Sequence, residues 1–351
     1  MIKWLSCIFI VFFGLVSFVG HLPKKPTPMP FIYPKNWPKP LYNFKENPLT
    51  YEGFELGKTL FYDTRLSKDS SISCNSCHQQ FAAFSTYDHS LSHGISDSLT
   101  HRNAPALQNL AWKPLFNADG GIHHLDVQPL APITAPNEMG ETIENVLKKL
   151  NRDKKMQQMH FAAFGSKNFT TATLNKALSQ FVVQLISSNS KYDLVQQGKA
   201  NYILPEQLGH DIFMKKCVQC HVPPFFTDFS FRNVGLPKDK FLNDDGRMGI
   251  TTFSDDSLKF MVPSLRNVMV TAPYTHDGRF FGVQAMMEHY RKQVKATRQT
   301  DSLVRNFIPL SNFEIGQLTG FLYTLTDTSF LKNKNFAPKD YPIIPNFIHL
   351  H

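Results

Sequence analysis

The residues best suited to chemistry are four of the five cysteines, which form two motifs of the same kind. Each motif is a Cys-x-x-Cys pair followed at once by histidine: Cys74, Cys77 and His78 in the first, and Cys217, Cys220 and His221 in the second. Two thiols at this spacing can form thioether bonds to the vinyl groups on one edge of a porphyrin, and the adjacent imidazole can ligate its iron. The motifs therefore predict two covalently bound haems of the c type.

Other uses of paired cysteines fit this sequence less well. A zinc ribbon needs its two pairs close together, whereas these pairs begin at positions 74 and 217. A thioredoxin-like redox pair needs no histidine after the second cysteine and occurs beside a βαβ pattern. A disulfide across two intervening residues is strained. Covalent haem remains the interpretation that uses every residue of both motifs.

The composition indicates a folded, basic protein of about two domains. The chain has 351 residues, of which 42% are hydrophobic and 19% are charged, so it can bury a core and is not globally disordered. Its 37 Lys and Arg exceed its 28 Asp and Glu, which gives a net charge of +9. No basic run or aromatic-basic stripe accompanies this charge, so we expect no nucleic-acid partner. Part of the excess would offset the propionates of two haems.

The N-terminal residues indicate export. Residues 1–20 are almost wholly apolar and carry Lys3 as their single charge. This pattern is typical of a signal peptide or a membrane anchor, although the run is short for a helix that spans a bilayer. We therefore expect a periplasmic protein, either free or anchored to the inner membrane. Residues 21–48 contain eight prolines and predict an extended linker.

The rest of the chain consists of two related halves, residues 49–200 and 201–351. Four blocks recur in the same order. In one half they are Leu56-Gly57, the first haem motif, Pro105-Ala106-Leu107-Gln108-Asn109 and Asp119-Gly120. In the other they are Leu208-Gly209, the second motif, Pro263-Ser264-Leu265-Arg266-Asn267 and Asp277-Gly278. Apolar residues at helical spacing predict helices over 142–163, 172–188, 206–216, 282–295 and 311–326. We predict a mainly α fold, in which two cytochrome c-like haem domains pack together with long ordered loops.

Several further motifs resemble one known family. They are Leu56-Gly57-Lys58-x-Leu60-Phe61-x-Asp63-x-Arg65-Leu66-Ser67, Arg102-Asn103-Ala104-Pro105, Gln128-Pro129-x-x-Pro132, Glu138-Met139-Gly140, Asp245-Gly246-Arg247 and Pro273-Tyr274-x-His276-Asp277-Gly278-Arg279-Phe280. Together with the haem motifs, this set resembles the bacterial di-haem cytochrome c peroxidases and their MauG-type relatives. The resemblance extends from about residue 50 to residue 330 and covers both haem domains.

The resemblance implies that the haem on His78 is the one that reacts with peroxide. Glu138 would be the acid-base residue that moves a proton between the peroxide oxygens, Gln128 would orient the peroxide, and Pro132 would line the same distal wall. In the peroxidases a histidine on a mobile loop caps this haem in the resting enzyme. His93 is the best match for that ligand, with an exposed loop histidine as the alternative.

For the second haem, on His221, the resemblance implies the role of receiving electrons. Many of the peroxidases ligate this haem with Met on the distal side, whereas the matching position here is Tyr290, as in the MauG-type branch. An anionic phenolate lowers the iron potential and a thioether raises it. The alternative for Tyr290 is an aromatic residue that only packs under the haem. The family often places Trp between the haems as an electron relay, and Ala118 occupies that position here.

The resemblance also implies one calcium ion between the domains, held by Asn103 and by the backbone carbonyls of Thr271 and Pro273, and it implies a homodimer. The function that follows is reduction of hydrogen peroxide to water with electrons from a small donor protein, a cytochrome c or a cupredoxin. Two alternatives stay open: an oxidative protein-modifying enzyme of the MauG type, which Tyr290 favours and Ala118 disfavours, and a di-haem electron carrier without catalysis, against which Gln128 and Glu138 argue.

Overall fold

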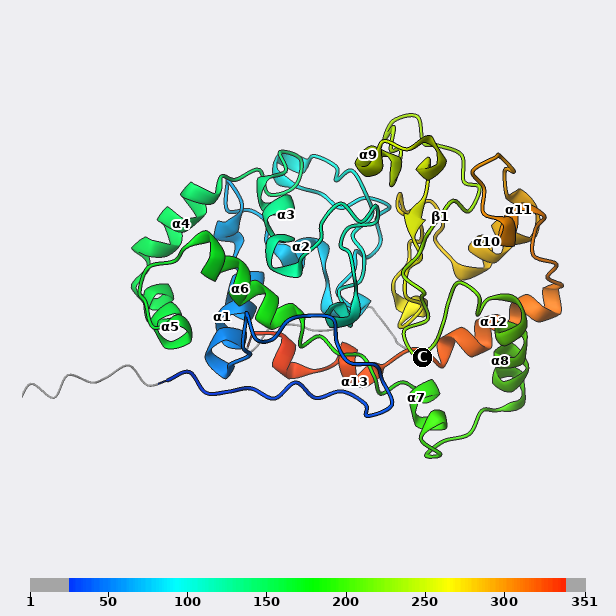
Figure 1. Ribbon diagram of the computed structural model, residues 1–351, viewed down its shortest axis with the longest axis horizontal. Helices are drawn as coiled ribbons and strands as arrows, with labels where there is room; N and C mark the ends of the chain where they lie inside the picture. The colour runs from blue at the N-terminus through cyan, green and yellow to red at the C-terminus, as the bar shows by residue number, and fades with distance from the viewer. Residues whose placement is uncertain (1–24, 339–351) are drawn as a thin grey trace, which may run out of the picture.

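The computed structural model describes residues 25–338 and consists of two mainly helical lobes side by side (Figure 1). Within that range the named strands are β1 (Phe231–Arg232) and β2 (Phe260–Met261), a short antiparallel pair in the second lobe. The predicted mainly α fold is confirmed. The apolar residues 1–20 lie outside the described residues, and no helix of the described part is long and apolar enough to cross a membrane.

The first lobe is built around a close helix pair. Its helices are α1 (Tyr51–Phe61), α2 (Cys74–Cys77), α3 (Leu130–Thr134), α4 (Ile143–Arg152), α5 (Lys154–Phe164) and α6 (Thr171–Val182). Helix α1 packs on α6 and α5. A Cβ added at Gly57 would lie 1.9 Å from the carbonyl oxygen of Ala177, so only glycine permits this approach of α1 to α6.

The second lobe repeats this arrangement. Its helices are α7 (Lys191–Gln196), α8 (Leu204–Lys216), α9 (Met248–Thr251), α10 (Val283–Glu288), α11 (Ser302–Arg305) and α12 (Asn312–Tyr323), and α8 packs on α12. A Cβ added at Gly209 would lie 2.0 Å from the carbonyl oxygen of Gln317. The glycine of the repeated Leu-Gly block therefore allows the same close crossing in both lobes.

The observed helices differ from the predicted ranges at their ends. The predicted helix 142–163 is two helices, because the Asp153 carboxylate accepts hydrogen bonds from the backbone N–H groups of Lys155 and Met156 and starts α5 anew. The predicted helix 172–188 ends at Val182. The predicted helix 282–295 continues from α10 into a π-helical turn over His289–Gln293.

The two apolar cores draw on residues from both sides of residue 200, where the sequence divides the two halves. Tyr192 of α7 lies in the apolar core of the second lobe. At the other end, α13 (Thr328–Leu331) and the turn Lys334–Phe336 return to the first lobe, and Phe330 and Phe336 belong to its core. The last described residues of the chain thus complete the domain formed by the first.

The proline-rich residues 25–48 form no helix and lie along the lower edge of the first lobe, as far as the junction with the second (Figure 1). They are fastened to the first lobe, since the N–H groups of Leu41 and Tyr42 both donate to the carbonyl oxygen of Ala111, at 2.8 and 3.0 Å. Trp37 of this segment is only 6% exposed and belongs to the first core. The segment is therefore part of the packed body.

Candidate haem sites

The two haem motifs have the same local geometry. In the first, the N–H group of His78 donates to the carbonyl oxygen of Cys74 at 2.9 Å, and in the second, that of His221 donates to Cys217 at 3.0 Å. The first motif forms the short helix α2, whereas the second is a turn that begins at the end of α8. In both cases one tight turn sets the two cysteines and the histidine on a single short stretch.

Each motif histidine is oriented by a backbone carbonyl. The Nδ1 atom of His78 lies 2.8 Å from the carbonyl oxygen of Phe84, and that of His221 lies 3.0 Å from the carbonyl oxygen of Phe226. A carbonyl only accepts, so each Nδ1 carries the proton and each Nε2 keeps a free lone pair. Burial lowers the pKa of both imidazoles, which favours the neutral, ligating form.

The thiols of the motif cysteines are also available to bind haem. None of the four motif cysteines, all of which lie in the described part of the chain, is in a disulfide. Burial raises the pKa of Cys74 and of Cys217 to about 12, so these groups are protonated thiols at neutral pH. Free thiols beside a neutral imidazole with an available Nε2 are the donor set that a covalent c-type haem requires. The residues present therefore fit one such haem in each lobe.

The three residues expected on the distal side of the first haem lie on one compact unit. Gln128 follows the turn Leu125–Val127, Pro132 lies in α3, and Glu138 lies in the turn that ends that helix. The turn is fixed by hydrogen bonds from the N–H group of Glu138 to Ala135 (3.0 Å) and from that of Met139 to Pro132 (3.1 Å). The fold thus places Gln128, Pro132 and Glu138 close together in a single supersecondary unit.

The carboxylate of Glu138 is half-buried and has no hydrogen-bond or ion-pair partner within residues 25–338. Burial raises its pKa above the ordinary carboxyl value. Its negative charge in turn raises the pKa of the thiols of Cys74 and Cys77, so the carboxylate lies within electrostatic range of the first haem motif. An unpaired, partly desolvated acid beside a haem motif can exchange a proton with a ligand bound there.

The loop that carries His93 lies against this unit. The N–H group of Ile95 donates to the carbonyl oxygen of Glu138 at 2.8 Å, and a Cβ added at Gly94 would lie 2.1 Å from the carbonyl oxygen of Asn137. The His93 imidazole itself is half-exposed, and its Nδ1 atom lies 2.6 Å from Asp97. In this structure His93 is thus paired with a carboxylate at the edge of the site.

Tyr290 lies in the π-helical turn that follows α10, and its N-terminal neighbour His289 is buried. Burial, followed by the charges of Cys220 and Cys217, raises the pKa of the phenol above its usual range. The thiols of the second motif are therefore within electrostatic range of the Tyr290 hydroxyl. Single π turns occur frequently at functional sites.

Ala118 lies between the lobes, where its backbone carbonyl oxygen accepts a hydrogen bond from the N–H group of Met261 at 2.7 Å. The interface also contains a partly buried ion network that sequence reasoning missed, in which Arg102 pairs with both Asp119 (2.6 Å) and Asp244 (2.6 Å). Arg102 stands directly before Asn103 in the family-like motif. The place of Arg102 in that motif was the sequence signal that could have revealed the ion network.

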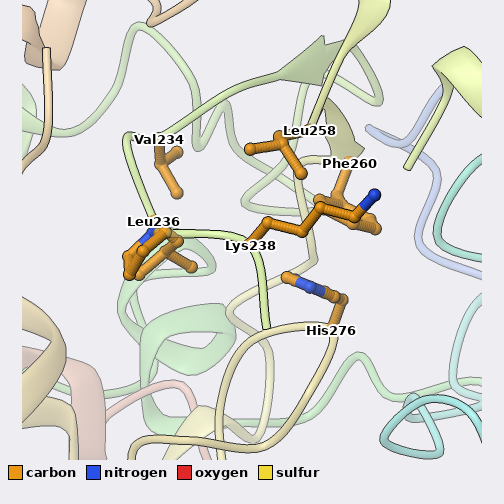
Figure 2. Close-up of a pocket in the computed structure, with 7 residues that line it drawn as sticks. Val234, Leu236, Lys238, Leu258, Phe260 and His276 are labelled. Carbon is orange, nitrogen blue, oxygen red and sulfur yellow. The ribbon is translucent and has the colours of Figure 1, made fainter. Parts of the chain in front are cut away.

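Asn103 and His276 meet at this interface. The N–H group of Asn103 donates to the carbonyl oxygen of His276 at 2.8 Å, and its side-chain amide donates to Ser90 at 2.9 Å. The His276 ring stacks on Phe260 with centroids 3.7 Å apart. Figure 2 shows this stack at the edge of a small pocket whose lining residues are Val234, Leu236, Pro237, Lys238, Leu258, Phe260 and His276. No hydrogen bond joins Thr271 or Pro273 to Asn103 among the described residues, so the calcium site stays a prediction.

Two helical lobes, each with a complete donor set for one covalent haem, define a di-haem c-type cytochrome. Comparison with known proteins identifies the family within this class. Residues 51–201 match the family model for di-haem cytochrome c peroxidase. The chain belongs to the di-haem cytochrome c peroxidase and MauG family.

The relatives come from both branches of that family. The chain is 34% identical to the methylamine utilization protein MauG of Methylorubrum extorquens, over 84% of this chain and 83% of that protein. It is 32% identical to the cytochrome c551 peroxidase of Nitrosomonas europaea, over 78% and 79% of the two chains. Among solved structures it is similar to a MauG-like protein associated with microbial copper homeostasis, with a TM-score of 0.82, 31% identity and coverage of 88% of this chain and 99% of that one.

Proposed function

We propose that this protein reduces hydrogen peroxide to water at the His78 haem, with electrons that a small cytochrome c or cupredoxin delivers to the His221 haem. Family membership supports peroxide as the substrate and a redox protein as the partner. Two haems suit the reaction because peroxide takes up two electrons, whereas such donors carry one each.

A single observation carries this proposal: the unpaired, partly desolvated carboxylate of Glu138 beside the first haem motif. A protein that only carried electrons would have no use for such a group, because leaving a buried acid unpaired is unfavourable. The unit that holds Glu138 also holds Gln128 and Pro132, which supports a site made of an acid-base group, an amide and an apolar wall.

The bound haem would supply the iron that binds peroxide and receives the electrons. In its carboxylate form, Glu138 takes the proton from the near oxygen of peroxide and gives it to the far oxygen, which then leaves as water. The Gln128 amide has no other hydrogen-bond partner among the described side chains and can orient the peroxide by donating to it. Pro132 cannot donate a hydrogen bond and limits the access of water from its side of the site.

Replacement of Glu138 by Gln tests the proposal. The amide has nearly the same shape but cannot accept and return the proton, so we expect peroxidase turnover to fall by about a hundredfold or more. The visible spectra of both haems should be retained. Glu144→Gln, at an exposed position in the first turn of α4, is the matched control and should leave turnover unchanged. Unaltered turnover in Glu138→Gln would refute the role.

A MauG-type activity is the second candidate, and the position of Tyr290 beside the second haem motif favours it. In a MauG-type activity, the oxidising equivalents of peroxide would oxidise a protein substrate. A protein that co-purifies with the chain and gains oxygen or a cross-link when peroxide is added would support this activity. Turnover sustained by a donor cytochrome alone supports the peroxidase. A chain whose haem spectra do not respond to peroxide would be an electron carrier.

We also propose export to the periplasm by residues 1–20, a homodimeric state, and a calcium ion at Asn103 with Thr271 and Pro273. In support of the ion, the Oδ1 atom of Asn103 has no hydrogen-bond partner within residues 25–338, and amide and carbonyl oxygens suit calcium.

A further inference from the structure

Two tryptophans form an aromatic cluster where the lobes meet. The rings of Trp37 and Trp112 lie 5.1 Å apart between centroids, in an edge-to-face arrangement. Phe225, which follows the second haem motif in the chain and belongs to the core of the first lobe, contacts both, at 4.7 Å from Trp37 and 5.2 Å from Trp112. Trp112 is 2% exposed, so this cluster is inside the protein. The proline-rich segment, the first half of the chain and the second half each contribute one of these three rings.

The cluster continues to the molecular surface. The Tyr33 ring lies 5.4 Å from Trp112, and the Phe31 ring lies 5.6 Å from Trp112 and 5.5 Å from Tyr33. Tyr33 is partly exposed, and its neighbour Ile32 is 74% exposed. A continuous column of rings therefore extends from the interior to the outside of the protein.

The inner end of the column adjoins the second haem motif. Phe225 immediately precedes Phe226, whose carbonyl oxygen accepts the Nδ1 proton of His221. The path from the surface to the proximal histidine thus consists of neighbouring rings, the backbone that joins Phe225 to Phe226, and one hydrogen bond. The aliphatic Ala118 occupies the interdomain position at which the resemblance implies a relay, and Trp37 and Trp112 are the two tryptophans within the described residues.

We propose that Trp112 and Tyr33 form a redox relay, which passes single electrons from a one-electron reductant at the surface of the proline-rich segment to the His221 site. Trp and Tyr are the side chains that give up one electron most readily, and their rings are in contact here. The relay would serve peroxide reduction when the donor protein is scarce, so this inference rests on the proposed function.

The two indoles have different surroundings, and this gives them different roles in the relay. The guanidinium of Arg266 lies 4.7 Å from the ring centroid of Trp37, and this fixed positive charge opposes the loss of an electron from that ring. Trp112 has no cation over its ring among the described residues, and its indole N–H donates to the carbonyl oxygen of Pro38 at 2.8 Å. The electron is therefore removed from Trp112, and Trp37 packs beside it.

The electrons and protons of this step balance. One peroxide takes up two electrons and two protons and gives two molecules of water. Without a donor protein, Trp112 loses one electron and is refilled from Tyr33, and then loses a second. The oxidised Trp112 keeps its N–H proton, since a carbonyl is not a base, and remains a radical cation. Tyr33 releases its phenol proton to solvent and becomes a neutral radical. That proton and one from solvent supply the two that peroxide needs.

The test uses the mature di-haem protein, treated with hydrogen peroxide in the absence of any donor. We expect an organic radical signal in electron paramagnetic resonance and, in peptide mass spectra, oxygen adducts at Trp112 and Tyr33. Trp112→Phe should lose the radical signal and the adducts at Tyr33, while both haem spectra still respond to peroxide. Tyr51→Phe, at an exposed tyrosine outside the column, is the matched control and should behave as wild type.

Tyr33→Phe keeps the test decisive if Trp112→Phe does not fold. It should retain adducts at Trp112 and lose the tyrosyl component of the signal. A haem response without any radical in the wild-type protein, or an unchanged radical in either variant, would overturn the relay and leave the peroxidase proposal standing. Absence of any haem response to peroxide would instead refute the proposed function itself.

Discussion

Arg266 and Asp193 form a two-point ion pair inside the second lobe, with Nη1–Oδ2 and Nη2–Oδ1 distances of 2.9 and 2.8 Å. Arg266 is 0% exposed and also donates from Nε to the carbonyl oxygen of Pro224. The same guanidinium faces Trp37. One buried side chain therefore joins α7, the loop after the second haem motif and the proline-rich segment.

The first prediction concerns this pair. Asp193→Asn leaves a buried guanidinium without its counter-charge, so the free energy of unfolding should fall by about 3 kcal/mol. Chemical denaturation followed by far-ultraviolet circular dichroism measures the change. Asp255→Asn removes an exposed ion pair with Arg298 and should change stability little. Equal effects of the two substitutions would contradict the account.

The second prediction is a shift in the pH dependence of turnover. Burial raises the pKa of Glu138, and the proposed reaction needs its carboxylate to take the first proton. Activity should therefore be full above this raised pKa and decline as the pH falls through it, at a higher pH than an ordinary carboxyl would give. A pH profile of kcat/KM measures this acid limb. A limb at the ordinary carboxyl pKa would show that Glu138 is not the group that titrates.

The third prediction concerns Tyr290. If its phenolate oxygen ligates the iron of the second haem, Tyr290→Phe removes an anionic ligand and should raise the reduction potential of that haem. The axial-ligand signature in electron paramagnetic resonance should change for this haem alone. Tyr323→Phe, at an exposed tyrosine of α12, is the control. An unchanged potential and spectrum would mean that Tyr290 only packs against the haem.

The fourth prediction tests the contact between the His93 loop and the turn of Glu138. Gly94→Ala would push its new methyl group into the backbone carbonyl of Asn137, so we expect a loss of about 2 kcal/mol in stability together with lower turnover. Gly316→Ala, an exposed position in α12 with nothing nearby, should instead gain about 1 kcal/mol. Normal stability in Gly94→Ala would show that the loop is free to shift.

The fifth prediction concerns the proposed calcium ion. Treatment with a calcium chelator should lower peroxidase turnover, and added calcium should restore it while magnesium should not, because magnesium demands a tighter octahedral site. Asn103→Ala should weaken calcium binding, which isothermal titration calorimetry measures directly. Metal analysis that finds no calcium in the active protein would refute the site.

The sequence predicted those features that depend on short stretches of chain. The haem motifs and the repeated Leu-Gly block are local patterns, and each corresponds to one local structure. The distal roles of Gln128, Pro132 and Glu138 stay predictions. The break between α4 and α5 was also readable, because Asp153 is a strong helix-starting residue. The ends of the other helices depend on tertiary packing, so the sequence alone predicted them less well.

Other features depend on partners far apart in the chain, which one sequence does not reveal. Trp37 looked like part of a linker because prolines surround it, yet Trp112 and Phe225 bury it. The Asp193–Arg266 pair joins residues that no spacing rule connects. The π turn at Tyr290 requires an altered hydrogen-bond pattern within an otherwise helical sequence, and side-chain periodicity does not report it.

The return of α13 to the first lobe has a consequence for how the protein is made. Phe330 and Phe336 pack against Phe84, whose own carbonyl orients His78. During synthesis the first haem motif emerges early, but the wall behind its histidine is completed only when the final segment arrives. The amino-terminal half therefore cannot reach its finished form until α13 and the turn after it have joined it, so completion of the first haem site depends on a segment far along the chain.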